Sequence, residues 1–331
     1  MKNTIELEKQ LLSPPGDTIQ EEINFVGMSQ AELAERMGRP KEKINDLIKG
    51  REALTTNTAF QLEKVLGIPA HFWLNREFTF RQELFALEQK EALTKQKSWL
   101  EKFPVAQLKK LGFLPQTTEK DILVDSLLKF FCVASPEEWR KIYLDKKVSV
   151  AFRVSLAQTQ SPEALSTWIR LGEIQSGKLT LSEFDKSAFK SALLELGGKA
   201  NSQSKINLRE IQELIAASGV ALVITPKITH ASIKGSAHWH HNKPILQLSE
   251  SLISKKSFWF TFFHEAGHIV LHGKKDVFLE DVAGAIVDMK KEEEANAFAR
   301  GYLGKVGSAG AAQLFLFTEI LSTFNEALDL N

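Results

Sequence analysis

The sequence lacks the features that would place the protein outside the cell or in a membrane. It has one cysteine among 331 residues, so no disulfide can form within the chain. No apolar run approaches the ~20 residues of a membrane helix, and the opening letters MKNTIELEKQ contain no apolar core of a signal peptide. We therefore expect a cytoplasmic protein with no membrane association. The cysteine, Cys132, lies among apolar neighbours in KFFCVAS, and we expect it in a core.

The sequence also lacks charge of one dominant sign. Its formal net charge is +1, so charge alone indicates no class of partner. Hydrophobic residues make up 43% and charged residues 25% of the chain, which is ordinary for a globular protein. No repeat or low-complexity tract interrupts it. Because a domain typically has about 100–200 residues, the length predicts more than one domain.

A five-residue motif, HEAGH, lies inside the apolar stretch FWFTFFHEAGHIVLHG. Residues four apart share one face of an α-helix, so His264 and His268 are expected to direct two imidazoles at one metal ion. Glu265 lies beside them, where its carboxylate would reach a water molecule on that metal. The apolar flanks predict that the motif is buried, and a metal would satisfy its polar groups. The motif therefore predicts the site of a zinc hydrolase with Glu265 as the general base.

A catalytic zinc takes three protein ligands and keeps one position open. The acidic segment KKEEEANAFARGYL offers three candidates for the third ligand, Glu292, Glu293 and Glu294. We favour Glu292, because Asn296 then lies four residues later on the same face and would hydrogen-bond a ligating histidine. His272 is a rival ligand, but Gly273 follows it and is expected to end the helix, which favours a capping or rim position.

Together these segments resemble the ImmA/IrrE family of zinc metallopeptidases. The resemblance rests on KPILQLSESLISKKSFWFTFFHEAGHIVLHGKKDVFLE followed by EEEANAFA, and it covers roughly residues 219–303. It implies an α+β zincin-like domain in which a strand pair leads into the HEXXH helix and the third ligand falls on Glu292. It also implies a site-specific protease, whose substrates in this family include repressors with helix-turn-helix domains. Two features depart from the family pattern. The run of three glutamates leaves the register of the third ligand open, and the usual L-M/L-P ending after the ANAFA segment is missing.

The implied mechanism is hydrolysis assisted by Zn²⁺. The metal would lower the pKa of its water and polarise the scissile carbonyl, while Glu265 would take the proton and pass it to the leaving amine. Upstream, alternation in GSAHWHH predicts a strand with His238 and His240 on one face. One of the four histidines in this segment could donate to a developing oxyanion or hold a substrate backbone; these are His230, His238, His240 and His241. The β-branched run VALVITP predicts another strand.

The N-terminal segment has the signals of short helices separated by turns. Ser29 and Glu32 form a capping box, Gly38 ends that helix and Pro40 suits the start of the next. The second helix leaves a set of polar residues outward, in reach of DNA phosphates or base edges. These candidate DNA-binding residues are Arg39, Lys41, Lys43, Asn45, Lys49 and Arg51.

This segment resembles the lambda-repressor-like domains of the XRE family, and within them antitoxins of the HigA type. The resemblance rests on PPGDTIQEEI and IKGREALTTNTAFQLEKVLGI, about sixty residues in all. It implies binding to an operator DNA, and a toxin as one candidate partner. The alternative is a helical bundle that contacts other proteins. The segment from Met28 to Arg51 contains six basic and four acidic residues, and this small excess of positive charge permits DNA binding without requiring it.

We therefore predict a mainly α-helical protein with a small β-sheet, divided into three parts. Residues 1–80 form a five-helix helix-turn-helix domain, 81–205 a helical middle region with a long first helix that ends before Pro104, and 206–331 the metallopeptidase domain. The predicted function is a transcriptional regulator, expected to be a homodimer, fused to a zinc-dependent endopeptidase. The alternative is a repressor or HigA-like antitoxin whose C-terminal domain senses metal or peptide without turnover.

Overall fold

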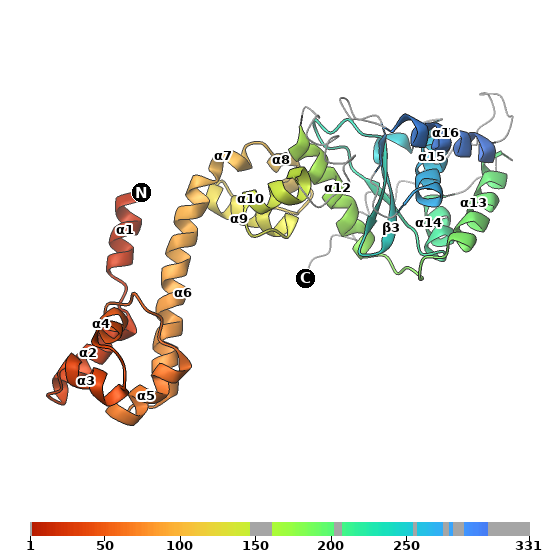
Figure 1. Cartoon of the computed structure of the whole chain (residues 1–331). Coiled ribbons are helices and arrows are strands. Elements are labelled where there is room, and N and C mark those ends of the chain that lie inside the picture. Colours follow the sequence, from red (N-terminus) through yellow and green to blue (C-terminus); the bar gives the residue numbers. More distant parts are fainter. Residues whose placement is uncertain are drawn as a thin grey trace. The chain divides into compact units, whose positions relative to one another are not determined.

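The computed structural model describes residues 2–145, 161–201, 207–253, 257–273, 278–280 and 288–303. The chain divides into two compact units, Met1–Lys97 and Ser98–Asn331. It is mainly α-helical with one small sheet, which confirms the predicted fold class (Figure 1). Among the described residues, no helix combines the length and the apolar character needed to span a membrane. The boundary after Lys97 falls inside the predicted middle region, and the division into three parts stays a prediction.

The first unit is entirely helical in its described residues. Its helices are α1 (Lys2–Gln10), α2 (Pro15–Phe25), α3 (Gln30–Met37), α4 (Lys41–Ile48), α5 (Thr56–Leu66) and α6 (Ala70–Lys95). Helices α2 to α6 share one hydrophobic core, to which Ile19, Leu33, Ile44, Leu62 and Trp73 each contribute a fully buried side chain. These five helices form the domain that the helical periodicity predicts.

Local signals set the ends of α3 and α4. The Ser29 hydroxyl accepts a hydrogen bond from the Glu32 backbone N–H at 3.1 Å, which satisfies one of the donors that a helix start leaves open. Gly38 ends α3 with φ of 62°, a left-handed conformation that glycine adopts without strain. Gly16 on α2 lies directly against the carbonyl of Ile48 at the end of α4, where a side chain would clash. The absence of that side chain lets α2 and α4 pack closely.

Helix α6 continues beyond this core. It begins at Ala70 and ends at Lys95. The predicted long helix was expected to continue to Pro104, and this predicted end was wrong. A short helix, α7 (Lys97–Leu100), follows. Phe78 and Phe85 on α6 are 68% and 59% exposed and lie two turns apart on the same helix face. Together with Arg81 and Glu88 they line a shallow cavity of about 520 Å³.

The second unit contains short helices followed by a four-stranded sheet and its covering helices. The helices are α8 (Val105–Lys110), α9 (Lys120–Phe131), α10 (Pro136–Arg140) with the π-helical turn Lys141–Asp145, α12 (Pro162–Gly177), α13 (Lys186–Asn201), α14 (Leu208–Ala216), the 3₁₀ turn Glu250–Leu252, α15 (Phe258–Leu271) and α16 (Met289–Leu303). The strands are β1 (Ala221–Thr225), β2 (Gly235–His240), β3 (Lys243–Ser249) and β4 (Phe278–Glu280).

The sheet has the strand order β1-β3-β2-β4, with β1 parallel to β3 and the other pairs antiparallel. Its two faces carry different helices. Helices α13 to α15 pack on one face in a core with Leu222, Ala237 and Leu246. Helix α12 covers the opposite face, where the Gln247 amide donates to the Trp168 carbonyl at 2.7 Å. Figure 1 shows the sheet between these layers.

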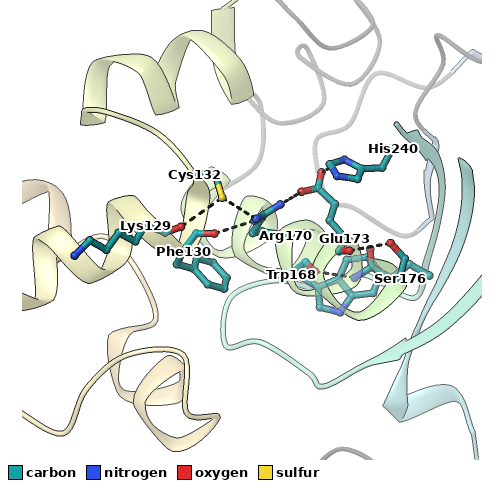
Figure 2. A network of polar contacts seen from close by, with 9 residues as sticks. Lys129, Phe130, Cys132, Trp168, Arg170, Glu173, Ser176 and His240 are labelled. Atoms are coloured by element: carbon teal, nitrogen blue, oxygen red, sulfur yellow. Dashed lines mark hydrogen bonds and ion pairs between the residues drawn. The ribbon is translucent and has the colours of Figure 1, made fainter. Parts of the chain in front are cut away.

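A polar network ties α9, α12 and β2 together (Figure 2). The Arg170 guanidinium donates to the Phe130 carbonyl at 2.8 Å and pairs with Glu173 at 2.9 Å. Glu173 in turn lies 3.5 Å from a ring nitrogen of His240. The Arg170 guanidinium also lies 3.1 Å from the sulfur of Cys132. Cys132 is exposed at the left-handed end of α9, so the prediction of a core cysteine was wrong. The apolar neighbours Phe130 and Phe131 are buried on α9, whereas Cys132 follows the helix, where the chain turns.

Candidate metal centre

Helix α15 places the HEXXH residues in the interior. Ten successive residues, 261–270, are buried. Apart from the motif itself, the helix is mostly apolar on all sides, and α13, α16 and the sheet cover it. His264, Glu265 and His268 are 3%, 0% and 2% exposed. Buried polar groups of this kind need partners.

The structure brings His264, His268 and Glu292 together. Their ligand atoms all lie within 4.8 Å of one another. The two Nε2 atoms are 3.0 Å apart, and Glu292 oxygens lie 3.1 Å from His264 Nε2 and 3.5 Å from His268 Nε2. Ligand atoms at ~2 Å from a tetrahedral zinc are about 3.3 Å from one another. The spacing of these three groups therefore fits one small metal ion.

Glu292 reaches the histidines because α16 packs tightly on α15. At Gly267 of the motif, an added Cβ would lie 3.1 Å from Phe298 and 3.3 Å from the Ala295 Cα on α16. Only glycine leaves this much room, so the helices approach closely. One turn after Glu292, the Asn296 side-chain oxygen lies 3.1 Å from His264 Nδ1. This contact favours a proton on Nδ1 and leaves Nε2 free to bind a metal.

The charge states of the cluster suit a cation. Burial lowers the pKa of His268 to about 4, so its imidazole is neutral at pH 7. Burial raises the pKa of Glu292, but hydrogen bonds with His264 and His268 outweigh burial and lower it to about 2. Two imidazoles and one carboxylate are a common ligand set of catalytic zinc.

The remaining candidates around the motif lie outside this triad. His272 ends α15 and donates from Nε2 to the Lys291 carbonyl at 3.2 Å, while its other nitrogen lies 3.9 Å from Glu294. Glu293 and Glu294 are exposed. His240 faces α12 through its contact with Glu173, and by strand alternation His238 faces the same way, opposite to α15. The suggestion that a histidine supports an oxyanion was therefore wrong for His238 and His240.

Sequence reasoning missed an aromatic wall of the site. The Phe278 ring of β4 stacks on the His268 imidazole, with centroids 3.8 Å apart and an interplanar angle of 10°. The Lys291 ammonium lies 5.7 Å from the same ring centroid. No spacing in the sequence signals this contact, because it depends on β4 pairing with β2.

The candidate DNA-binding residues lie on and after α4 in the first unit. Lys41, Lys43, Lys49 and Arg51 are exposed, and Asn45 is half-buried. Two of them form surface ion pairs, Lys43 with Glu52 at 2.9 Å and Arg51 with Asp46 at 2.5 Å. Arg39 is half-buried and donates to the Gln61 side chain at 2.6 Å. This bond connects the turn between α3 and α4 to α5.

Each unit contains a segment that matches a known family model. Residues 219–327 match the model of the peptidase M78 family, described as an IrrE N-terminal-like domain. Residues 26–73 match a helix-turn-helix model. The chain joins a helix-turn-helix domain to an IrrE-like domain. The IrrE-like domain contains the HEXXH helix and the cluster of His264, His268 and Glu292. Similarity to this metallopeptidase family implies a metal cofactor, and the ligand cluster fits one.

The helix-turn-helix domain has further similar proteins. YddM, an HTH-type transcriptional regulator of Escherichia coli, is 36% identical over 61 residues, which are 18% of this chain and 65% of that protein. The chain thus spans less than two thirds of that relative. A HigA-family addiction module antidote protein from Coxiella burnetii is 29% identical, covering 27% of this chain and 89% of that one, with a TM-score of 0.21. An antidote protein of a plasmid maintenance system from Nostoc punctiforme is 27% identical, covering 25% and 89%, with a TM-score of 0.22.

Proposed function

We propose that the chain is a DNA-binding transcriptional regulator fused to a zinc-dependent endopeptidase that cuts a regulatory protein. The observation that carries the peptidase part is the convergence of His264, His268 and Glu292, with the fully buried Glu265 next to His264 in the chain. Three ligands and a neighbouring carboxylate are the parts that metal-assisted hydrolysis needs. The substrate is a protein, and another helix-turn-helix repressor is a candidate.

Each residue then has one task. His264, His268 and Glu292 hold the zinc, which when bound polarises the scissile carbonyl and activates water. Asn296 fixes the ring of His264 through its 3.1 Å contact. Glu265 accepts a proton from the attacking water and returns it to the leaving amine. His272, Glu293 and Glu294 lie outside the proposed ligand set, at the end of α15 and the start of α16.

The DNA-binding part rests on α3 and α4. In a helix-turn-helix domain the second helix enters the major groove, and α4 here presents Lys41, Lys43 and Asn45, followed by Lys49 and Arg51. We assign these residues to contacts with an operator DNA. We assign Arg39 to the same contacts and also to fixing the turn between α3 and α4 through its hydrogen bond with Gln61. We also propose a homodimer, because such domains read two half-sites of a palindrome. A regulator of this kind works in the compartment that holds its DNA.

The peptidase is tested first by its metal and then by turnover. We expect about one zinc per chain by elemental analysis in the parent and in Glu265→Gln, and much less in His264→Ala and Glu292→Ala. Glu293→Ala is the matched control, because Glu293 is adjacent to Glu292 and exposed, and it should keep the metal. Loss of metal in the control but not in Glu292→Ala would contradict the ligand assignment.

Turnover is measured by comparing protein N-termini in cells that carry the parent or Glu265→Gln. New N-termini that need Glu265 identify the substrate and its cleavage site. Full zinc with identical N-termini in both strains would overturn the endopeptidase and leave a metal or peptide sensor on a repressor or antitoxin. In that case a toxin becomes the partner to seek.

A further inference from the structure

The second strand of the sheet begins with a glycine that touches the candidate general base. An ideal Cβ built on Gly235 would lie 2.7 Å from Glu265 Oε1, 3.0 Å from Glu265 Cγ and 3.0 Å from the Thr261 methyl. Gly235 is buried, and so are Thr261 and Glu265. The Glu265 side chain therefore lies directly on the backbone of β2.

Gly235 is not there for its backbone freedom. The described glycines with positive φ are Gly27, Gly38, Gly50, Gly67, Gly112 and Gly219, and Gly235 is not among them. Its backbone conformation is one that any residue adopts. What the position requires is the absence of a side chain.

The backbone at Gly235 is also fixed on both sides. It pairs with Leu248 on β3 and with Glu280 on β4, and the neighbouring Lys234 carbonyl accepts from the Ser249 N–H at 2.8 Å. A strand held in two ladders moves less readily than the end of a glutamate side chain. An added methyl would therefore displace the Glu265 carboxylate, and Glu265 is itself 0% exposed.

We propose that Gly235 is a positioning residue of the peptidase, whose bare backbone forms the floor that sets the place of the Glu265 carboxylate. The inference rests on the proposed function, because it assigns a role toward the general base. Displacing a catalytic carboxylate by about 1 Å lowers the rate of the reaction roughly 100-fold. Gly235→Ala should therefore lower kcat by about 10- to 100-fold while KM and zinc content stay at the parent level.

A binding measurement gives a readout that is separate from turnover. Acetohydroxamate binds a catalytic zinc and shares its hydroxyl proton with a carboxylate beside the metal. Its Kd, measured by calorimetry on the zinc-loaded full chain, should rise about tenfold or more in both Gly235→Ala and Glu265→Gln. Gly198→Ala is the matched control, because an added Cβ on Gly198 of α13 meets nothing within 4 Å, and it should bind as the parent does.

The double variant Gly235→Ala with Glu265→Gln separates positioning from general damage. If Gly235 acts through Glu265, the double variant should show the turnover and the Kd of Glu265→Gln alone. An additive further loss, or zinc loss in Gly235→Ala, would overturn the inference. So would parent-like turnover and Kd in Gly235→Ala when Glu265→Gln is inactive. Parent-like turnover in Glu265→Gln itself would instead refute the proposed peptidase.

Discussion

His238 shows how the fold, and not the neighbouring sequence, sets the charge of a residue. It is 3% exposed on the α12 face of β2, and its Nδ1 lies 2.9 Å from the Ser236 hydroxyl. Burial lowers the pKa of His238 to about 3. An unfolded chain binds a proton at His238 near pH 6.5, whereas the folded chain does not until near pH 3.

This difference makes stability depend on pH. The contribution of a neutral His238 is fully present above pH 6.5 and is lost as the pH falls toward the folded pKa, because protons then favour the unfolded state. From pH 7 to pH 5 the second unit should lose about 2 kcal/mol of unfolding free energy through this residue. His238→Asn, which keeps a partner for Ser236, should remove that part of the pH dependence in urea titrations.

His230→Asn is the control for the same titrations, because His230 is exposed in the loop after β1. It should leave the difference between pH 7 and pH 5 unchanged. Equal pH dependence in the parent and His238→Asn would contradict a buried neutral histidine.

At the scale of helices and strands, the features predicted correctly from the sequence are those that local residue patterns determine. The capping box at Ser29, the left-handed Gly38 and the HEXXH helix all depend on residues within a few positions of one another. The contacts of Gly235 and Phe278 were not predicted, because they arise where β2 and β4 meet α15. Contacts between segments that are distant in the sequence produce no regular residue spacing from which they could be predicted. The end of α6 was missed for a related reason, since no proline or glycine marks it.

We predict that the two exposed lysines at the ends of α4 contribute to DNA binding. Lys41 and Lys49 are exposed at its two ends and form no ion pair that the described residues record, so they are available to DNA phosphates. Lys41→Ala and Lys49→Ala should each weaken operator binding. Each should also reduce the slope of log affinity against log salt by about one.

Lys64→Ala serves as the comparison, because Lys64 is an exposed lysine on α5, outside the proposed set. Its slope should equal that of the parent in titrations of a fluorescent operator. A slope change in Lys64→Ala, with none in the α4 variants, would place the DNA on another face.

At the scale of the whole molecule, the chain joins two units for which we propose different activities. Helix α6 contributes Trp73 to the core of the DNA-binding unit and runs to Lys95, just before the boundary between the units. Residues of the helical middle therefore connect the metal centre to the DNA-binding helices along the chain. We expect metal or substrate to shift this connection and so to change operator affinity.

Removing zinc with a chelator should change the operator Kd about fivefold or more, within the usual range of coupling between sites. By reciprocity, operator DNA should change the zinc affinity by the same factor. His264→Ala should match the chelated parent, whereas Glu265→Gln, which keeps its metal, should bind DNA as the zinc-loaded parent does. Equal DNA affinity with and without zinc would mean that the two units act independently.

The unequal exposure of the three candidate ligands has a consequence for metal exchange. The side chains of His264 and His268 are 4% and 1% exposed, whereas that of Glu292 is 21% exposed. Of the three groups that would hold a metal, Glu292 is thus the one nearest to solvent. We therefore expect an ion to reach Glu292 before the histidines, and we expect the start of α16 to control how fast the site takes up and releases its metal.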